Sequence, residues 1–266
     1  ESNLTHIANA RVWQIERELD EWVLHFIING CSEKIGAKVL ILATGAREYV
    51  QPTPGWTLPG VIGLAGATAL MKRDLLTPGK RTVVSGTGPL VFFVASEIRR
   101  LGGEVAAIVT PNSRADWLRA LPSMSYRIDL LRRGFVWVAD LLLAGIPIFW
   151  RHAIKQIDGE TKVQSVKVTK LGNDWSPKGP AHLLEADSVC LGHGLQAASE
   201  ASQLLGIDVK YQLELGGWVP EVQEDGITKI NGLFICGDGA GIRGAAAAEI
   251  QGKLAGLSAA KSIRPE

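Results

Sequence analysis

Short apolar runs alternate with glycine-rich turns along most of this chain, and this pattern predicts an α/β protein. The continuous apolar run at 233–236 is typical of a covered parallel strand. A turn with one acid and several glycines follows it, and an alanine-rich segment that favours helix begins at residue 245. We therefore expect a strand, a turn and a helix start in this order.

The turn between this strand and helix carries the chemistry of a nucleotide site. Gly237 and Gly239 let backbone amides approach a ligand, as do Gly241 and Gly244 further along. Asp238 is the turn side chain that can accept two hydrogen bonds, which suits a sugar or polyol hydroxyl. The alternative is a strand-to-helix turn without a ligand, because glycine-rich turns are common between elements.

A second turn of this kind lies nearer the amino end. A β-branched strand at 81–85 leads into Gly86-Thr87-Gly88-Pro89, and an amphipathic helix at 91–101 and a strand at 104–110 follow. This order predicts the first βαβ unit of a dinucleotide-binding domain. Val91 stands where the fingerprint has its third glycine.

The strand at 104–110 ends without the acid that would hold a ribose 2′-hydroxyl. Arg114 lies just beyond it and could meet a 2′-phosphate, or it could be a solvated loop arginine. The nucleotide of this turn therefore stays open between NAD, NADP, another adenine nucleotide and none.

The remaining pattern supplies strands, helices and one irregular segment. The Pro/Gly-rich stretch 51–60 cannot continue a helix or a sheet and indicates a crossover between domains. Helices are expected at 63–73 and 114–131. Strands are expected at 10–16, 21–29, 38–43, 146–150 and 188–191, with a β-meander at 153–158, 163–170 and 183–185.

Composition narrows the class of protein. A formal net charge of +1 leaves no electrostatic footprint for nucleic acid. The longest apolar stretches are too short or too interrupted for a membrane span. Cys31, Cys190 and Cys236 form no Cys-x-x-Cys, and two of them lie in strand patterns, so we expect reduced thiols in a cytoplasmic protein. The five histidines show no metal-ligand spacing, and no metal site is expected.

No catalytic residue can be assigned from the pattern. Neither a nucleophile motif nor a carboxylate pair is evident. Glu249 could face a ligand near Asp238, although a solvated helix carboxylate is the more common case. Trp56 and Trp218 could line a cleft or simply pack in the core.

Five motifs, in this order, resemble those of flavoproteins with two dinucleotide domains. The resemblance covers nearly the whole chain and is strongest to the α-type subunits of opine oxidases, hydrogen cyanide synthases and heteromeric proline or sarcosine dehydrogenases. The motifs are Ala-Thr-Gly-Ala at 43–46, Gly-Trp-Thr-Leu-Pro-Gly-Val at 55–61, Ser-Gly-Thr-Gly-Pro-Leu at 85–90, Val-Cys-Leu-Gly-His-Gly-Leu at 189–195 and Cys-Gly-Asp-Gly at 236–239.

The resemblance implies a fold with two Rossmann-like, three-layer domains, one inserted in the other, with β-meanders. An FAD-binding-type domain would comprise residues 1–77 and 191–266, and an inserted NAD(P)-binding-like domain would comprise 78–190. No strand-Gly-x-Gly-helix unit precedes residue 86, so the amino-terminal part of the flavin domain is expected to be absent from the sequence. His193 departs from the family, where we expect an aromatic residue.

The resemblance also implies site residues. Asp238 matches the acid that bonds the ribityl chain of FAD or its adjoining phosphate, with Gly237 and Gly239 beside it and Thr44 and Gly45 in a neighbouring loop. The second nucleotide-binding turn is matched by Gly86, Gly88 and Pro89.

The implied function is the oxidation of a C–N bond of an amino or imino acid by hydride transfer to flavin. The complete protein would hold FAD, bind NAD(P) or another adenine nucleotide, and assemble with a second flavoprotein subunit. Two alternatives are a NAD(P)H-dependent flavoprotein reductase that feeds a separate carrier and a non-catalytic nucleotide-binding module.

Overall fold

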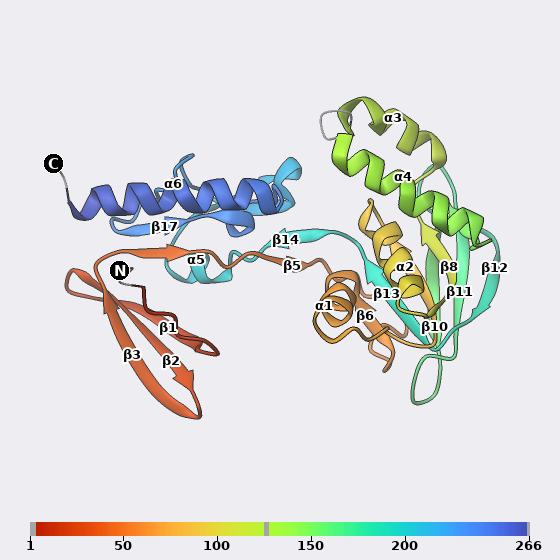
Figure 1. The fold of residues 1–266 in the computed structure, drawn as a ribbon, viewed down its shortest axis with the longest axis horizontal. Coiled ribbons are helices and arrows are strands. Elements are labelled where there is room, and N and C mark those ends of the chain that lie inside the picture. Colours follow the sequence, from red (N-terminus) through yellow and green to blue (C-terminus); the bar gives the residue numbers. More distant parts are fainter. Residues whose placement is uncertain (1–3, 125–127, 265–266) are drawn as a thin grey trace. The chain divides into compact units, whose positions relative to one another are not determined.

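The computed structural model describes residues 4–124 and 128–264, which form a mixed α/β protein (Figure 1). The chain divides into two compact units. The inserted unit is Glu48–Gly194, and the split unit comprises the residues up to Arg47 together with those from Leu195 onwards. The two ends of the chain therefore build one unit around an insertion.

The inserted unit begins at residue 48, earlier than the boundary at 78 that the sequence suggests. Strand β6 (Val61–Gly63) pairs in parallel with β13 (Ser188–Gly192), so it belongs to the sheet of the inserted unit. The Pro/Gly stretch also lies in this unit, because the amide of Ile157 donates to Pro54 O at 2.8 Å. Composition marks this stretch as irregular but does not reveal its partners.

A five-stranded sheet forms the middle of the inserted unit, in the order β6-β13-β7-β8-β9. Its strands β7 (Arg81–Gly86), β8 (Glu104–Thr110) and β9 (Ile148–Trp150) run parallel. Neighbouring residues of a strand face opposite sides of a sheet. Val84 accordingly lies in the core that also contains the helices, and Val83 in the core on the other side.

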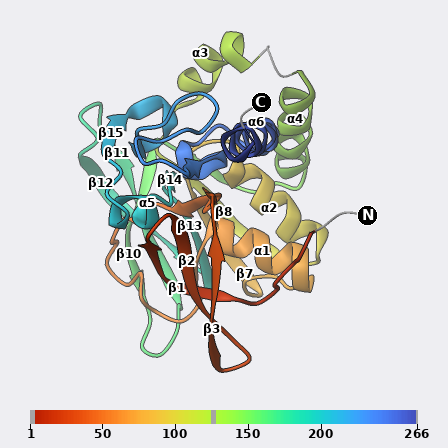
Figure 2. The same ribbon diagram turned by 90° about the vertical axis from the view of Figure 1, so that its left-hand side faces the viewer.

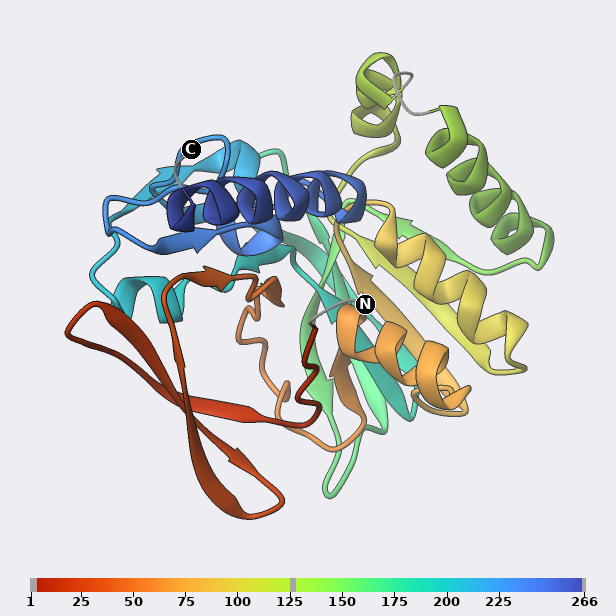
Figure 3. The same ribbon diagram turned by 60° about the vertical axis from the view of Figure 1, so that its left-hand side comes forward.

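Helices cover one face of this sheet (Figure 3). They are α1 (Leu64–Asp74), α2 (Leu90–Arg100) and α4 (Ile128–Leu143), and α3 (Arg114–Met124) precedes α4. The expected helix at 114–131 is therefore two helices, and residues 125–127 lie outside the described part of the chain. The helix predicted from the sequence ended at residue 131, so most of α4 was missed.

An antiparallel meander covers the other face of the sheet. It consists of β10 (His152–Asp158), β11 (Ser165–Leu171) and β12 (Pro177–Glu185). Ile157, Val166 and Val168 form a core with Val83 and Val109 of the parallel sheet. The predicted meander is confirmed, although its third strand begins earlier than residue 183 because polar, exposed residues form its first half.

The split unit begins with a second antiparallel sheet, of β1 (Arg11–Glu18), β2 (Glu21–Ile28) and β3 (Cys31–Ala37) (Figure 2). Strand β3 was not predicted, because it is mostly exposed and lacks an apolar face. Trp22 from β2 packs in one core with Leu40 and Leu233.

The parallel part of the split unit consists of β4 (Leu40–Leu42) and β17 (Leu233–Ile235). A short 3₁₀ turn, η3 (Gly237–Ala240), follows β17, and α6 (Ala245–Ile263) follows the turn. The other elements are β5 (Ala46–Glu48), β14 (Leu195–Ala197), α5 (Glu200–Leu204), β15 (Val209–Gln212), η2 (Leu213–Leu215) and β16 (Gly217–Pro220). Among the described helices, none combines the length and apolar character needed to cross a membrane.

Candidate functional site

The predicted flavin-site residues come together at the carboxyl ends of β4 and β17. The amide of Cys236 donates to Leu42 O at 3.0 Å, so the two strands end side by side. A Cβ built on Gly239 would lie 2.7 Å from Thr44 Oγ1 and 3.3 Å from the amide nitrogen of Gly45. Ligands of open α/β sheets bind at this end of the strands. The fold therefore juxtaposes two loops that are far apart in the sequence.

Asp238 is oriented by the backbone that follows it. Its Oδ1 accepts hydrogen bonds from the amides of Arg243 at 3.0 Å and Gly244 at 3.1 Å. Within the described residues, Oδ2 has no hydrogen-bond partner. One oxygen of this half-buried carboxylate thus stabilises the start of α6, and the other remains available to a hydroxyl donor.

Only part of the glycine-rich turn can serve a ligand. The amides of Gly241 and Gly244 both donate to Asp238, through its carbonyl oxygen and its Oδ1 respectively. The amide of Ile242 donates to Leu215 O at 2.9 Å. Gly237 and Gly239 lie in the first turn of η3, where amides have no intrahelical acceptor. Two of the four glycines therefore serve the fold of the turn itself.

Thr44 and Gly45 are tied to the segment before α5. The hydroxyl of Thr44 donates to Ala198 O at 2.7 Å, and the amide of Ala198 donates to Gly45 O at 3.0 Å. A Cβ on Gly45 would meet no atom within 4 Å, and its φ of +71° favours glycine. This loop is held rigidly by the protein and still presents an open side at Gly45.

A groove of about 620 Å³ runs along β4 in the split unit. Of the residues predicted for the flavin site, Thr44 lines it. Most of its walls are apolar side chains of β1, β2, β4 and the segment around α5, including Val12, Ile15, Leu24, Leu40, Leu42 and Leu205. In the described part of the chain, β4 pairs with β17 alone. Because a groove beside an unpaired strand edge suits an added strand as well as a small molecule, we assign no ligand to it.

The two glycines of the Gly-x-Gly turn in the inserted unit differ in the space beside them. At the first, protein atoms already fill the space that a Cβ would take, and at the second this space is open. At Gly86 a Cβ would lie 2.0 Å from the carbonyl oxygen of Gly192, which accepts the amide of Thr87 at 2.9 Å. At Gly88 a Cβ would meet no atom within 4 Å, and φ is +75°. Gly86 therefore allows β7 and β13 to approach each other, and Gly88 is the glycine that leaves room for a ligand.

The residues after Gly88 begin the helix. Pro89 occupies the N-cap of α2 in a helical conformation (φ −72°, ψ −18°), and its carbonyl accepts the amide of Phe93 at 3.2 Å. Val91, at the position of the third fingerprint glycine, is fully buried among the helices that cover the sheet. Its side chain fills the space in which a third glycine would let helix and strand pack closely.

Three titratable groups in or just after β13 and β17 have shifted pKa values. Burial raises the pKa of the Cys190 thiol, with the nearby Glu48 carboxylate as a lesser cause, and burial also raises the pKa of Cys236. Burial lowers the pKa of His193, which follows β13 beside the Gly-x-Gly turn. All three cysteines are free. Among the described residues, no group of three or more His, Cys, Asp or Glu could hold a metal ion.

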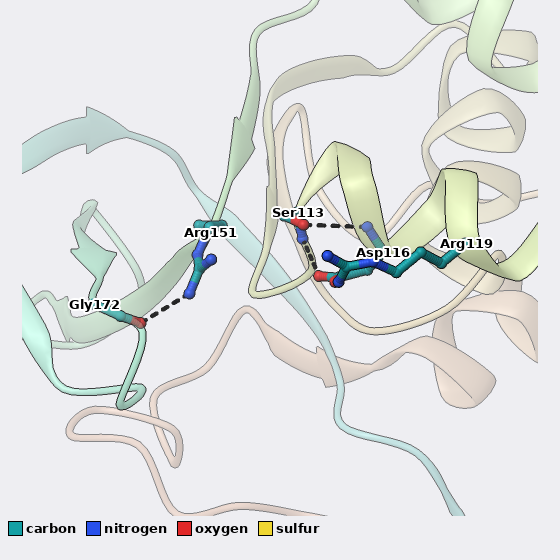
Figure 4. Close-up of polar contacts among 5 residues, drawn as sticks. All are labelled: Ser113, Asp116, Arg119, Arg151 and Gly172. Atoms are coloured by element: carbon teal, nitrogen blue, oxygen red, sulfur yellow. Dashed lines mark hydrogen bonds and ion pairs between the residues drawn. The ribbon is translucent and has the colours of Figure 1, made fainter.

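One polar cluster near the second turn was missed in the sequence. Ser113, Asp116, Arg119 and Arg151 gather where β8 and β9 end (Figure 4). The spacing Ser-x-x-Asp at 113–116 is a capping signal and could have been recognised. No sequence signal points to Arg151, because it joins the cluster only through the parallel pairing of β8 with β9.

Together, a Gly-Asp turn after one parallel strand and a Gly-x-Gly turn in an inserted α/β unit define a protein with two dinucleotide-binding-type units. Comparison with known proteins agrees with this class. The chain belongs to the family described as pyridine nucleotide-disulphide oxidoreductase, whose profile matches residues 1–252. The predictions of an FAD-dependent oxidoreductase class, of a Rossmann-like α/β fold and of FAD and NAD(P) as cofactors are confirmed at the level of this family.

The relatives lie in the branch that the motifs suggest. Hydrogen cyanide synthase subunit HcnB of Pseudomonas aeruginosa is 30% identical over 226 residues, covering 82% of this chain and 47% of the relative. An opine oxidase subunit of Agrobacterium tumefaciens is 29% identical over 272 residues, covering 99% of this chain and 52% of the relative. The chain thus spans about half the length of these curated relatives.

A solved structure supports the fold. The L-proline dehydrogenase from P. horikoshii aligns with a TM-score of 0.67 at 17% identity, covering 96% of this chain and 40% of that one. Identity at this level shows a shared fold and not a shared activity. In this chain Cys190 is buried in the inserted unit and Cys236 is buried in the split unit, and the sequence contains no Cys-x-x-Cys. The family's disulphide chemistry therefore has no cysteine-pair motif in this sequence.

Proposed function

We propose that the complete protein is one subunit of an FAD-dependent oxidoreductase that oxidises a C–N bond of an amino or imino acid. The observation that carries this proposal is the similarity to the Agrobacterium opine oxidase subunit along 99% of this chain. Opines are secondary amines derived from amino acids. Loss of a hydride from the carbon next to nitrogen, and of a proton from nitrogen, gives an imine, and water then splits its C–N bond. Flavin supplies the hydride acceptor in such reactions.

The residues of the split unit fit the polyol arm of a flavin. Oδ2 of Asp238 lacks a partner within the described residues, and its carboxylate is held in one orientation by two amides through Oδ1. A fixed acceptor of this kind bonds hydroxyl groups without losing much side-chain entropy. Gly45 leaves room for a ligand, and Gly239 allows its own turn to approach Thr44 closely. In the proposal, Gly237, Asp238, Gly239, Thr44 and Gly45 form this binding surface.

The residues of the inserted unit fit an adenine dinucleotide. Gly88 faces open space at the carboxyl edge of a parallel sheet, where α2 begins. Backbone amides at such a helix start bind phosphate. We assign Gly88 and Pro89 to the binding surface. Gly86 instead allows β7 and β13 to pack closely. The domain assignment follows: a flavin unit made of both chain ends and a nucleotide unit in the middle.

The names of the relatives also support a partner. HcnB and the opine oxidase relative are both named as subunits. The partner that we propose is a second flavoprotein subunit, and the proposed substrate is a small amino or imino acid. The open Gly-x-Gly turn of the inserted unit favours a second candidate function, in which NADH or NADPH reduces the flavin and a separate carrier receives the electrons.

The substitution Asp238→Asn tests the flavin site directly. Asparagine keeps the oxygen that accepts the amides of Arg243 and Gly244, and it replaces the unpartnered oxygen by an NH₂ donor. The complete protein should keep its unfolding midpoint and lose about tenfold or more in flavin affinity, because a charge-assisted acceptor is removed. Asp208→Asn is the matched control, since Asp208 forms a surface ion pair with Lys229 in the same unit. Unchanged flavin affinity in Asp238→Asn would mean that Asp238 serves the turn alone.

The absorbance spectrum of the complete flavoprotein separates the two functions. Bleaching by an opine or amino acid, with no bleaching by NADH or NADPH, supports the amino-acid-oxidising subunit. Bleaching by a nicotinamide nucleotide alone supports the reductase. If neither bleaches a flavin that is bound, both candidate functions are wrong for this protein.

A further inference from the structure

Helix α4 of the inserted unit is apolar on two sides, and the described structure covers one of them. The inner side packs on α2, where Leu141 is fully buried and the ring centres of Trp137 and Phe93 lie 5.2 Å apart (Figure 1). A surface helix ordinarily carries one apolar stripe, with polar residues opposite to it. The packing of the inserted unit therefore accounts for the inner side of α4 and leaves the outer side unexplained.

The outer side of α4 consists of large apolar side chains that are exposed to solvent. Ile128, Phe135 and Leu142 recur at intervals of seven residues, and Val136 and Leu143 form a second row beside them. Residues seven or eight apart lie on one face of a helix. The exposed fractions of these five residues, which we call the outer stripe, range from 58% to 90%. Because a contiguous exposed apolar patch marks an interaction surface, we expect the outer stripe to have a partner.

Two arginines accompany the outer stripe. Arg132 lies four residues after Ile128 and three before Phe135, so it belongs to the same face of the helix. Arg133 lies three residues before Val136, at the border of this face. Both arginines are exposed, and neither forms an ion pair with a described residue. The outer stripe thus combines apolar side chains with two cations that lack an acceptor within the described chain.

The segment that contains α3 and α4 is positively charged. Residues 114–143 include five arginines and three aspartates, with no lysine or glutamate. Asp116 pairs with Arg119, and Asp140 pairs with Arg99 of α2. The two pairs neutralise two of the three aspartates, so arginine is in excess beside the outer stripe. An exposed apolar helix face with a basic border attracts an anionic surface.

A lipid surface fits this combination better than a protein partner does. A protein interface needs a matched shape, and it needs an acceptor at a fixed place for each arginine that it buries. Acyl chains instead take apolar side chains without a matched shape, and the long arginine side chain reaches headgroup phosphates beside them. With 16 residues, α4 is shorter than the roughly 20 that a membrane span needs, so this helix would lie along the surface.

We propose that the outer stripe of α4 inserts into the surface of an anionic lipid bilayer, with Arg132 and Arg133 bound to headgroup phosphates. The inner side of α4 stays packed on α2, so the inserted unit keeps its fold when it binds. This inference is independent of the proposed function, because it uses neither glycine-rich turn.

Flotation of the purified complete protein with lipid vesicles tests the inference. One set of vesicles contains phosphatidylcholine alone, and the other contains phosphatidylcholine mixed with phosphatidylglycerol. We expect the protein to bind the mixed vesicles at least about fivefold more tightly, since each arginine near an anionic surface contributes about that factor. Added salt should weaken this preference, because it screens the attraction between arginine and phosphate.

Single substitutions in the outer stripe separate its apolar and charged parts. Phe135→Gln and Leu143→Gln should each lower the affinity for the mixed vesicles about tenfold, because an apolar side chain no longer leaves water. Arg132→Gln should lower this affinity about fivefold and change the affinity for phosphatidylcholine vesicles much less.

Leu183→Gln and Lys155→Gln are the matched controls. They remove an exposed leucine and an exposed lysine from the meander on the other face of the same sheet. Neither control should change binding to either kind of vesicle. Urea unfolding of each variant checks that the fold is kept. Leu143 is 90% exposed, so Leu143→Gln is the decisive variant if Phe135→Gln unfolds.

Three results would overturn the proposal. The first is that neither kind of vesicle carries the protein, or that both carry it equally well. The second is vesicle binding that Leu143→Gln leaves unchanged. The third is an oligomer, detected by light scattering, that Leu143→Gln dissociates while no vesicle is bound. In that case the outer stripe is an interface between copies of the protein, and the assignment to lipid is wrong.

Discussion

Two glycines of one turn should respond very differently to the same substitution. Gly86→Ala and Gly88→Ala each add one methyl group, two positions apart in the turn after β7. At Gly86 the new Cβ would lie 2.0 Å from the carbonyl oxygen of Gly192 and 2.7 Å from its carbonyl carbon. At Gly88 it would meet no atom within 4 Å. The first glycine is therefore a packing requirement, and the second is a conformational one.

The collision at Gly86 cannot be relieved locally. Gly192 lies opposite Gly86 in the pairing of β13 with β7, and its carbonyl accepts the amide of Thr87 at 2.9 Å. Moving that carbonyl breaks the bond or separates two central strands. Overpacking typically costs about 1–3 kcal/mol and a sparsely populated backbone conformation a further 1–3 kcal/mol, which gives about 2–6 kcal/mol for Gly86→Ala. For Gly88→Ala only the left-handed conformation at φ +75° counts, about 1–2 kcal/mol.

Urea unfolding, followed by circular dichroism, measures both free energies in the same buffer. We expect Gly86→Ala to lower the free energy of unfolding by at least about 1 kcal/mol more than Gly88→Ala does. The m-values should stay equal, so that the change reflects the folded state. If the two variants lose the same stability, β13 does not approach β7 as closely as the structure shows, and the division of the turn into a filled and an open glycine is wrong.

Two further predictions concern the titratable groups. Alkylation with iodoacetamide under native conditions should label Cys31 first, because Cys31 is exposed while burial raises the pKa of Cys190 and of Cys236. In a peptide map, Cys31→Ser should abolish the fast phase of labelling. Early labelling of Cys190 would contradict the structure. Burial lowers the pKa of His193, so the folded state disfavours its protonation and stability is lost as the pH falls below about 6.5 through the folded pKa. His193→Gln should make urea midpoints less sensitive to pH in this range, whereas an identical slope would show that His193 is solvated.

The sequence was sufficient for elements whose signal is local. The strand at 81–85 was predicted from its β-branched residues and the strand at 233–236 from its continuous apolar run, each followed by glycine, and α1 was predicted close to its observed bounds. β3 could not be found in this way, since its side chains are almost all exposed and its formation depends on pairing with β2. The first strand of the inserted unit was not found for a similar reason, because β6 has three residues and is defined by its partner β13.

The candidate sites show the same limit at the level of single atoms. A glycine-rich turn indicates that backbone comes close to something, but the pattern does not say whether that is a ligand or the protein. The amides of Gly241 and Gly244 donate to Asp238, and the absence of a side chain at Gly86 makes room for the carbonyl of Gly192. In each case the partner is fixed by tertiary structure.

Asp238 combines both uses in one side chain, and this combination has a consequence for the flavin site. Since Oδ1 accepts the amides of Arg243 and Gly244 just before α6, losing the carboxylate altogether would disturb the turn as well as any ligand. A test by alanine therefore cannot distinguish a residue that binds a ligand from one that orders the turn. The asparagine variant can, because it retains the oxygen that accepts the amides of Arg243 and Gly244 and changes only the oxygen that has no partner within the described residues. The test of ligand binding at this turn thus depends on one atom, Oδ2 of Asp238.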